Sequence, residues 1–249
     1  MKDLPSFLRK PANFKAGSLD DTVKDYQPLL ATWLIEMALS MNWYRMPRPH
    51  RLPDILVDAD FLALTGITSR AELDEDGDPT RRTTMSLGAV VRLLKARLKA
   101  LRGCPVAGDL PLFSNVELIG NLLGLSNAEK AVLTFATVLS HFTCFKNVIS
   151  QRIERASSKR VAWIIAMLTG GMAEEMFAAT REDALLVASG LIVVERNMLD
   201  FEGAVQLGDG FESLMMLPHL SEEDLGKRIL KPASRAELNF AAFPHLASD

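Results

Sequence analysis

The sequence predicts a mainly α fold, in which a helical N-terminal domain is followed by a winged-helix-like module with one small β-hairpin. Apolar residues recur at helical spacing over most of the 249 residues, whereas one β-branched run, residues 191–195, has the pattern of a strand. Helices followed by a single small hairpin are the order of elements in a winged-helix module. Hydrophobic residues make up 48% of the chain and charged residues 24%, which is typical of a folded globular protein.

The first domain is expected to span residues 1–104. Early prolines and the lack of a sustained hydrophobic period predict an extended arm over residues 1–18. Ser18 or Asp20 is the expected cap of a helix that runs toward Tyr44, because both side chains accept hydrogen bonds from amides of a first helical turn.

Prolines and acidic residues separate the next elements. Pro28 is expected to begin a new helix rather than lie inside one, because proline lacks the amide proton that a helix interior uses. Three prolines in residues 46–53 predict a stiff, extended connection. A short helix is expected near residues 58–64, and residues 72–79 have the composition of an acidic loop.

The last helix of this domain carries the first candidate site. Residues 81–102 include seven basic residues and no acidic one. Six apolar side chains fall within a helical arc of about 100° that is expected to face the core: Leu87, Val90, Val91, Leu94, Leu98 and Leu101. Four cations cluster in the adjacent arc: Arg92, Lys95, Lys99 and Arg102. Aligned cations of this kind bind a polyanion or an acidic partner. The alternative is a solvated flank whose side-chain stems cover apolar surface.

Turn-forming residues crowd into positions 103–111 and mark the expected domain boundary. The winged-helix-like domain is assigned to residues 109–210. Hydrophobic periodicity predicts its helices near residues 116–123, 127–141, 159–169 and 173–179.

The hairpin and the C-terminal region complete the prediction. Residues 191–195 are expected to form the first strand, residues 196–198 a turn, and residues 199–205 the return strand. Residues 211–249 are assigned to a helical connector and tail. Its two helices are expected at residues 211–217 and 221–229.

Charge and cysteine content limit the function classes. The net charge is −3, from 28 basic and 31 acidic residues, so the chain as a whole makes no case for nucleic-acid binding. Cys104 and Cys144 are too few for a disulfide framework or a four-cysteine zinc site, which favours a reducing compartment. Residues 1–10 lack the pattern of a signal peptide, and no apolar stretch reaches the roughly 20 residues of a membrane span. We therefore expect a cytoplasmic protein without membrane contact.

No complete phosphate-binding loop is present in the sequence. Such a loop needs Gly-x-x-x-x-Gly-Lys-Ser/Thr, because backbone amides cradle the phosphates and the lysine neutralises their charge. One pair of glycines has the spacing, but Asp109 stands where the lysine belongs. A second partial match at Gly226 has the Gly-Lys dipeptide, but Arg228 stands where the hydroxyl belongs.

Other catalytic and metal patterns are equally incomplete. Three acidic residues of the 72–79 segment imitate the start of a calcium loop, but Pro79 replaces the glycine that the loop requires. His141 and Cys144 lie three positions apart and are the candidate base and nucleophile of a small helical enzyme, with a buried structural role for both as the alternative. We expect no catalytic residue, no metal ligand and no cofactor-binding residue in this chain.

Several short segments of the C-terminal half share the pattern of one protein region. The first segment contains the motif Leu-Gly-Leu-Ser-x-x-Glu. It is followed by a strand-like segment, by two Pro-His-Leu triplets, and by a segment near the C-terminus that contains phenylalanines. These segments are residues 122–133, 185–195, 217–225, 230–233 and 238–246. Together they resemble the winged-helix-containing region that precedes the core of bacterial AAA-type ATPases, and the resemblance covers residues 109–249.

The resemblance implies a role without catalysis for this chain. It implies recruitment of a partner or substrate, and assembly or regulation of an AAA-type ATPase whose core follows Asp249 in cis or belongs to a separate chain. ATP and magnesium are implied only for that core, as is a homo-oligomeric ring. Phe240, Phe243 and His245 are implied as a docking tail, and packing of the tail on its own domain is the alternative.

A winged-helix DNA-binding regulator or an adaptor is the main alternative. The helix near residues 173–179 would then read bases, and the basic run at residues 81–102 would contact phosphates. Glu174 and Glu175 disfavour this reading, because the exposed face of a reader helix is normally basic or rich in amides. We expect weak duplex binding or none.

Overall fold

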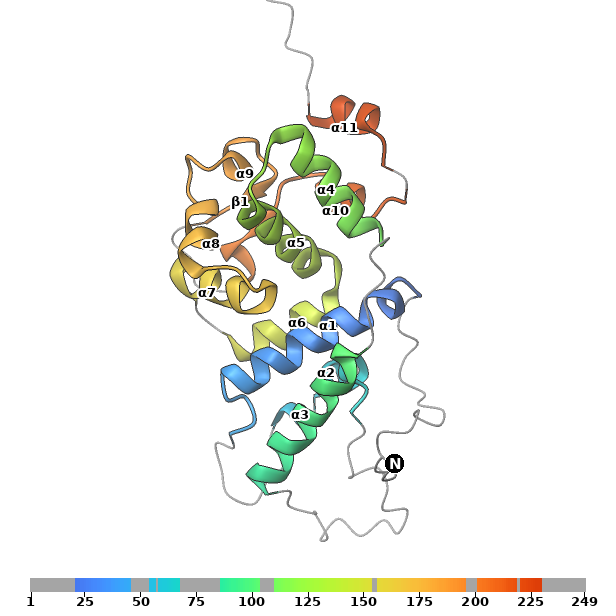
Figure 1. Cartoon of the computed structure of the whole chain (residues 1–249), viewed down its shortest axis with the longest axis vertical. Coiled ribbons are helices and arrows are strands. Elements are labelled where there is room, and N and C mark those ends of the chain that lie inside the picture. The colour runs from blue at the N-terminus through green and yellow to red at the C-terminus, as the bar shows by residue number, and fades with distance from the viewer. Residues whose placement is uncertain are drawn as a thin grey trace, which may run out of the picture.

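The computed structural model describes residues 21–45, 54–56, 58–67, 86–103, 110–153, 156–195, 201–218 and 220–229. These residues are mainly α-helical, with one two-stranded antiparallel sheet near the C-terminal end (Figure 1). The predicted fold class is therefore confirmed. The expected extended arm, the proline-rich connection, the acidic loop and the tail with Phe240, Phe243 and His245 lie outside the described residues.

Three helices and one short 3-10 helix make up the described N-terminal part. They are α1 (Asp21–Ser40), η2 (Asp54–Leu56), α2 (Ala59–Thr65) and α3 (Leu87–Arg102). α2 and α3 confirm the predicted helices, and each has a polar cap: the backbone N–H of Phe61 donates to Asp58, and that of Ala89 donates to Ser86.

Pro28 lies inside α1, so the expectation that it would begin a new helix is wrong. The carbonyl of Pro28 accepts a hydrogen bond from Thr32 Oγ1 at 2.7 Å. An internal proline costs a helix about 3 kcal/mol. The side chains of Leu30, Leu34 and Ala38 follow on one face and are fully buried, and burial of the two leucines offsets that cost by about 3 to 6 kcal/mol.

The remaining helices lie between residues 111 and 229. They are α4 (Pro111–Leu123), α5 (Asn127–His141), α6 (Thr143–Arg152), α7 (Ser158–Thr169), α8 (Ala173–Ala179), α9 (Leu185–Ala188), α10 (Phe211–Met215) and α11 (Glu222–Ile229). The bounds of α5 and α8 are those that the sequence predicts, whereas α6 and α9 were not predicted.

A sharp break at Phe142 divides the apolar run that the sequence shows after residue 131. Phe142 leaves the helical conformation with φ −98° and ψ 87°, and its side chain is buried. No single helix of the described ranges is long and apolar enough to span a membrane. Two consecutive pairs, α5 with α6 and α7 with α8, reach that length and composition together but bend by 99° and 119°.

The small sheet pairs β1 (Ile192–Val193) with β2 (Gln206–Leu207). Ile192 lies opposite Leu207 in an antiparallel register. The return strand begins after the predicted 199–205 range, because the 3-10 turn η4 (Glu202–Ala204) precedes it. Phe201, immediately before this turn, is buried and packs edge-on against Phe135.

One hydrophobic core runs through the described residues from Tyr26 to Leu225. Trp33 of α1 lies with its ring 5.9 Å from that of Phe135 in α5 and 6.0 Å from that of Phe145 in α6. Figure 1 shows α1 crossing the middle of the molecule beside α6. The N-terminal helices and the helices that follow therefore share buried contacts.

Glu129 connects two helix starts inside this core. Its Oε2 accepts hydrogen bonds from the backbone N–H and the hydroxyl of Ser126, which completes a capping box at α5. Its Oε1 accepts from the backbone N–H of Leu186, in α9, at 3.2 Å. A single buried carboxylate thus satisfies a donor at the start of its own helix and a second donor 57 residues after it.

Replacing Glu129 with alanine is expected to lower the free energy of unfolding by about 2 kcal/mol. The amides of Ser126 and Leu186 lose their acceptor, and a buried donor without a partner costs about 1 to 3 kcal/mol. Thermal unfolding should then occur about 4 to 8 °C lower. Glu117→Ala is the matched control, because that carboxylate is exposed and pairs with Lys130 at the surface. Equal losses in the two variants would contradict the role of Glu129.

Candidate functional site

The candidate site is the exposed side of α3. Val90, Leu94, Leu98 and Leu101 are buried, and they pack α3 against α1. The adjacent arc of the helix carries Arg92, Lys95, Lys99 and Arg102, all of them exposed. At 100° per residue these four fall within an arc of about 80° and span about 15 Å along the axis. The structure thus brings together the four cations that the sequence singled out.

Arg102 differs from the other three cations in having a partner. Its Nη2 donates to Glu36 Oε1 of α1 at 2.7 Å, and the arginine side chain is still 65% exposed. No ion pair joins Arg92, Lys95 or Lys99 to any other residue in the described ranges. We define the basic face as Arg92, Lys95 and Lys99. Arg102 is not included, because it pairs with Glu36 of α1.

A fifth cation, Arg97, fixes α3 to the end of α2. Arg97 Nε donates to the backbone carbonyl of Thr65 at 2.6 Å. Its guanidinium lies over Gly66, where a Cβ atom would come within 2.9 Å of Arg97 Nη2. Gly66 also has a positive φ of 64°, a conformation that favours glycine. The basic face is therefore part of a rigidly seated helix, and the sequence did not identify Arg97 as the residue that seats it.

His141 is the last residue of α5, whereas Cys144 belongs to α6. The chain leaves the helical conformation at Phe142, so Cys144, in the first turn of α6, does not continue the helical face of His141. The His141 ring instead packs edge-on against Phe142, with centroids 4.9 Å apart. Burial raises the pKa of the Cys144 thiol, the charge of Asp60 adds to that effect, and backbone hydrogen bonding at Phe145 partly opposes it. The thiol is thus held in its protonated, less nucleophilic form.

Alkylation of Cys144 by iodoacetamide is expected to be slower than that of an unfolded peptide thiol at pH 8. Because the pKa of Cys144 is raised, its thiolate fraction at this pH is lower, and the rate should still be rising above pH 9. A Cys104→Ala variant leaves Cys144 as the one reactive thiol, so mass spectrometry reports it alone. A rate that levels off below pH 8 would contradict the raised pKa.

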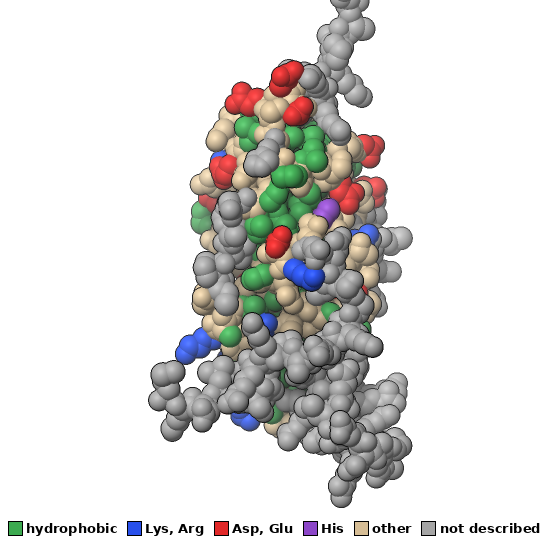
Figure 2. All heavy atoms as spheres, turned by 90° about the vertical axis from the view of Figure 1, so that its right-hand side faces the viewer, with side chains coloured by type: hydrophobic (Ala, Val, Ile, Leu, Met, Phe, Trp, Pro, Cys, Tyr) green, Lys and Arg blue, Asp and Glu red, His purple; other side chains and the backbone are tan. Residues whose placement is uncertain are grey.

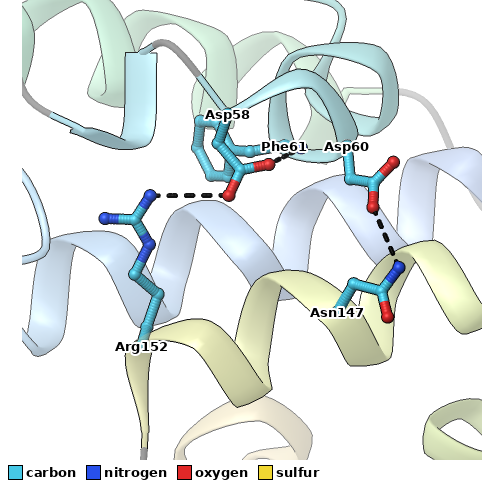
Figure 3. A network of polar contacts seen from close by, with 5 residues as sticks. All are labelled: Asp58, Asp60, Phe61, Asn147 and Arg152. Carbon is cyan, nitrogen blue, oxygen red and sulfur yellow. Dashed lines mark hydrogen bonds and ion pairs between the residues drawn. The ribbon is translucent and has the colours of Figure 1, made fainter.

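The sequence also did not predict a cluster of polar contacts between the start of α2 and α6 (Figure 3). Arg152 Nη2 lies 3.4 Å from Asp58 Oδ2, and the two side chains are only 15% and 7% exposed. Asn147 Nδ2 donates to Asp60 Oδ2 at 3.2 Å beside them. Asp58 also accepts from the backbone N–H of Phe61, so one carboxylate both caps α2 and faces the arginine.

α8 and the segment between α8 and α9 present exposed acidic side chains. Glu174 and Glu175 are exposed in the first turn of α8, whereas Met176 is buried. Before α9, Arg181 is paired with Asp183 at 3.1 Å. A phosphate backbone that approached either helix would meet this negative charge.

Exposed apolar side chains are a third feature that the sequence did not predict. Leu122 at the end of α4 is 46% exposed, and Leu217 after α10 is 44% exposed. Figure 2 shows hydrophobic side chains forming a band through the upper half of one face, with Asp and Glu side chains around it.

Among the described residues, no group of three or more His, Cys, Asp or Glu side chains is placed to hold a metal ion. In comparisons with known proteins, the chain matches no protein-family model, no curated protein and no solved structure.

Proposed function

We propose that this chain is a non-catalytic region that recruits a partner for an AAA-type ATPase and contributes to its assembly or regulation, in cis or in trans. The supporting observation is the basic face of α3. Its three cations stand on a helix that is fixed by Leu94 in the core and by Arg97 at Thr65, so an acidic partner meets a preformed surface. That the ATPase is of the AAA type is proposed from the sequence resemblance over residues 109–249.

The first experiment measures the mass of the native protein in its source cells with an antibody against this chain. A band far above 27.4 kDa supports an ATPase core in cis, and a band at 27.4 kDa directs the search to a separate ATPase. In either arrangement, ATP hydrolysis is then compared between the purified 249-residue chain and the assembly that the antibody isolates. We expect hydrolysis in the assembly and none in the isolated chain. Hydrolysis by the purified chain would overturn the proposal.

The basic face is tested with charge-neutral variants. Arg92→Ala combined with Lys95→Ala should reduce recovery of ATPase activity with the chain about tenfold or more at 0.05 M salt. Lys159→Ala combined with Arg160→Ala is the matched control, because it removes the same charge from an exposed part of α7. Equal recovery with both double variants would show that the basic face takes no part in recruitment.

The DNA-binding alternative predicts a different result with duplex DNA. Because Glu174 and Glu175 lie exposed on α8, the helix that would approach the bases, we expect no change in fluorescence anisotropy up to about 10 µM protein at 0.15 M salt. Tight binding that weakens steeply with added salt would favour the DNA-binding regulator instead.

A further inference from the structure

One face of α4 is covered at its start and open at its end. At 100° per residue, Asn115, Leu118 and Leu122 fall within an arc of about 60° on this helix. Asn115 is buried, and its side-chain amide donates to the backbone carbonyl of Leu217 at 2.9 Å, so the segment after α10 lies over this part of the face. Leu118 is only partly buried and Leu122 is 46% exposed. The cover therefore stops before the end of the helix.

Leu217 borders the open part of this face. Its carbonyl is bound to Asn115, whereas its side chain is 44% exposed. Leu118 and Leu122 lie one and two turns after Asn115, which places them within about 10 Å of it along the helix. We define the apolar patch as Leu118, Leu122 and Leu217.

The surroundings of the apolar patch are acidic. Residues 201–224, which form η4, β2, α10 and the first turn of α11, contain six acidic residues and no basic one. Figure 2 views the right-hand side of Figure 1, where α4, α10 and α11 lie, and shows hydrophobic side chains with Asp and Glu around them. An occupant of this surface is expected to be apolar at its centre and basic beside it.

The chain after α11 has that composition. α11 is held against the rest of the molecule, because Leu225 within it is fully buried. Residues 227–236 contain four basic residues and no acidic one. Residues 238–246 contain two phenylalanines and two leucines, and neither an acidic residue nor lysine or arginine. The chain therefore supplies a basic segment and then an apolar one, beginning from a helix that is fixed at the same end of the molecule as α4 (Figure 1).

We infer that residues 238–246 pack on the apolar patch of their own chain, with Phe240 and Phe243 as the side chains that cover it. Residues 230–239 separate α11 from Phe240 and span up to about 33 Å when extended, which is about the diameter of a small domain. The inference goes beyond the proposed function, because it concerns a contact within this chain and involves no ATPase.

The covalent connection favours this segment over the same segment of a second copy. A segment on a short linker has an effective concentration in the millimolar range, whereas a second copy is present only at the concentration of the protein. At micromolar protein, the contact within one chain therefore predominates. A separate apolar partner has to displace the segment before it reaches Leu122 or Leu217.

Photo-crosslinking of the 249-residue chain tests the inference. Ala242→p-benzoylphenylalanine places a photoreactive group between the two phenylalanines and leaves both in place. At about 1 µM protein, irradiation should link position 242 to peptides that contain the apolar patch, in a product with the mass of one chain. Ala12→p-benzoylphenylalanine puts the same group near the other end of the sequence and should not link to these peptides. A product with the mass of two chains, or no link to the patch, would overturn the inference.

Variants of the apolar patch identify the receiving surface. Leu122→Ser combined with Leu217→Ser should lower the yield of the link about fivefold or more, because two of the three leucines no longer offer apolar surface. Leu87→Ser combined with Val193→Ser is the matched control, since these side chains are 45% and 47% exposed on α3 and β1. The control should keep the yield of the parent chain. Equal yields from the two double variants would count against the patch as the receiving surface and overturn the inference.

A dye test examines the two phenylalanines in the absence of a crosslinker. Phe240→Ala combined with Phe243→Ala should raise the fluorescence of Nile red, a neutral dye that binds exposed apolar surface, about twofold or more. Phe7→Ala combined with Phe14→Ala removes two phenylalanines from the other end of the sequence and should leave the fluorescence unchanged. Circular dichroism should show the same helix content in all variants. Unchanged dye fluorescence in the Phe240 and Phe243 variant would overturn the inference. The proposed link to an ATPase would then still stand, because neither measurement involves ATP hydrolysis.

Discussion

Replacing Phe135 with alanine is expected to lower the free energy of unfolding by about 4 kcal/mol. The ring is fully buried, 5.9 Å from the ring of Trp33 and 6.2 Å from that of Phe201, which it meets edge-on. Phe135 therefore contacts α1 on one side and the segment before β2 on the other. Its removal leaves a cavity between elements that cannot close without moving one another. Thermal unfolding should occur about 8 to 16 °C lower.

The controls for Phe135 separate cavity formation from loss of an aromatic group. Phe135→Leu keeps most of the volume and should cost about 1.5 kcal/mol. Trp163→Ala removes a larger side chain that is 43% exposed on α7, and its cost should stay below about 1 kcal/mol. Urea unfolding measured by circular dichroism gives all three values. Similar losses at positions 135 and 163 would contradict the central position of Phe135.

Replacing Asp58 with alanine is expected to lower the free energy of unfolding by about 3 kcal/mol. The change removes the cap at Phe61 and leaves the mostly buried guanidinium of Arg152 without its counter-charge. Arg152 Nε is already buried without a hydrogen-bond partner in the described part of the chain, so the arginine has little other compensation. Thermal unfolding should occur about 6 to 12 °C lower.

Three further variants divide the effect of Asp58 into its parts. Asp58→Asn keeps an oxygen for the Phe61 amide and should cost about 2 kcal/mol, since only the charge is lost. Asp58→Ala combined with Arg152→Met should recover most of the stability, because no charge then remains buried. Asp60→Ala removes the hydrogen bond with Asn147 at the exposed rim and should cost less than about 0.5 kcal/mol. A double variant as unstable as the sum of its parts would contradict this account.

Helices whose signals are local in the sequence could be predicted. Ser126 and Glu129 supply the capping box that starts α5, and Gly124 with a φ of 71° ends the helix before it. The break at Phe142 has no such signal, because neither proline nor glycine accompanies it and the apolar run continues through it. The position of β2 was also missed, since it follows from the burial of Phe201 against another element.

For the candidate site too, residues with a local signal in the sequence could be predicted and contacts between distant elements could not. The exposure of Arg92, Lys95 and Lys99 follows from the period of α3 itself, and the sequence identified these residues. Partners that come from distant elements were not predictable. Glu36 lies 66 residues before Arg102, and Asp58 lies 94 residues before Arg152. Hydrophobic periodicity carries no information about which polar side chains meet across such separations.

The buried amide of Asn115 sets an order for folding during synthesis. Asn115 Nδ2, in α4, donates to the backbone carbonyls of Met215 at 3.0 Å and Leu217 at 2.9 Å, about 100 residues later. Until those carbonyls have left the ribosome, the amide has no partner in the core and must stay in contact with water. In a nascent chain that ends before residue 217, α4 therefore cannot complete its packing. The contacts of α1 with α2 and α3 can already form in that chain.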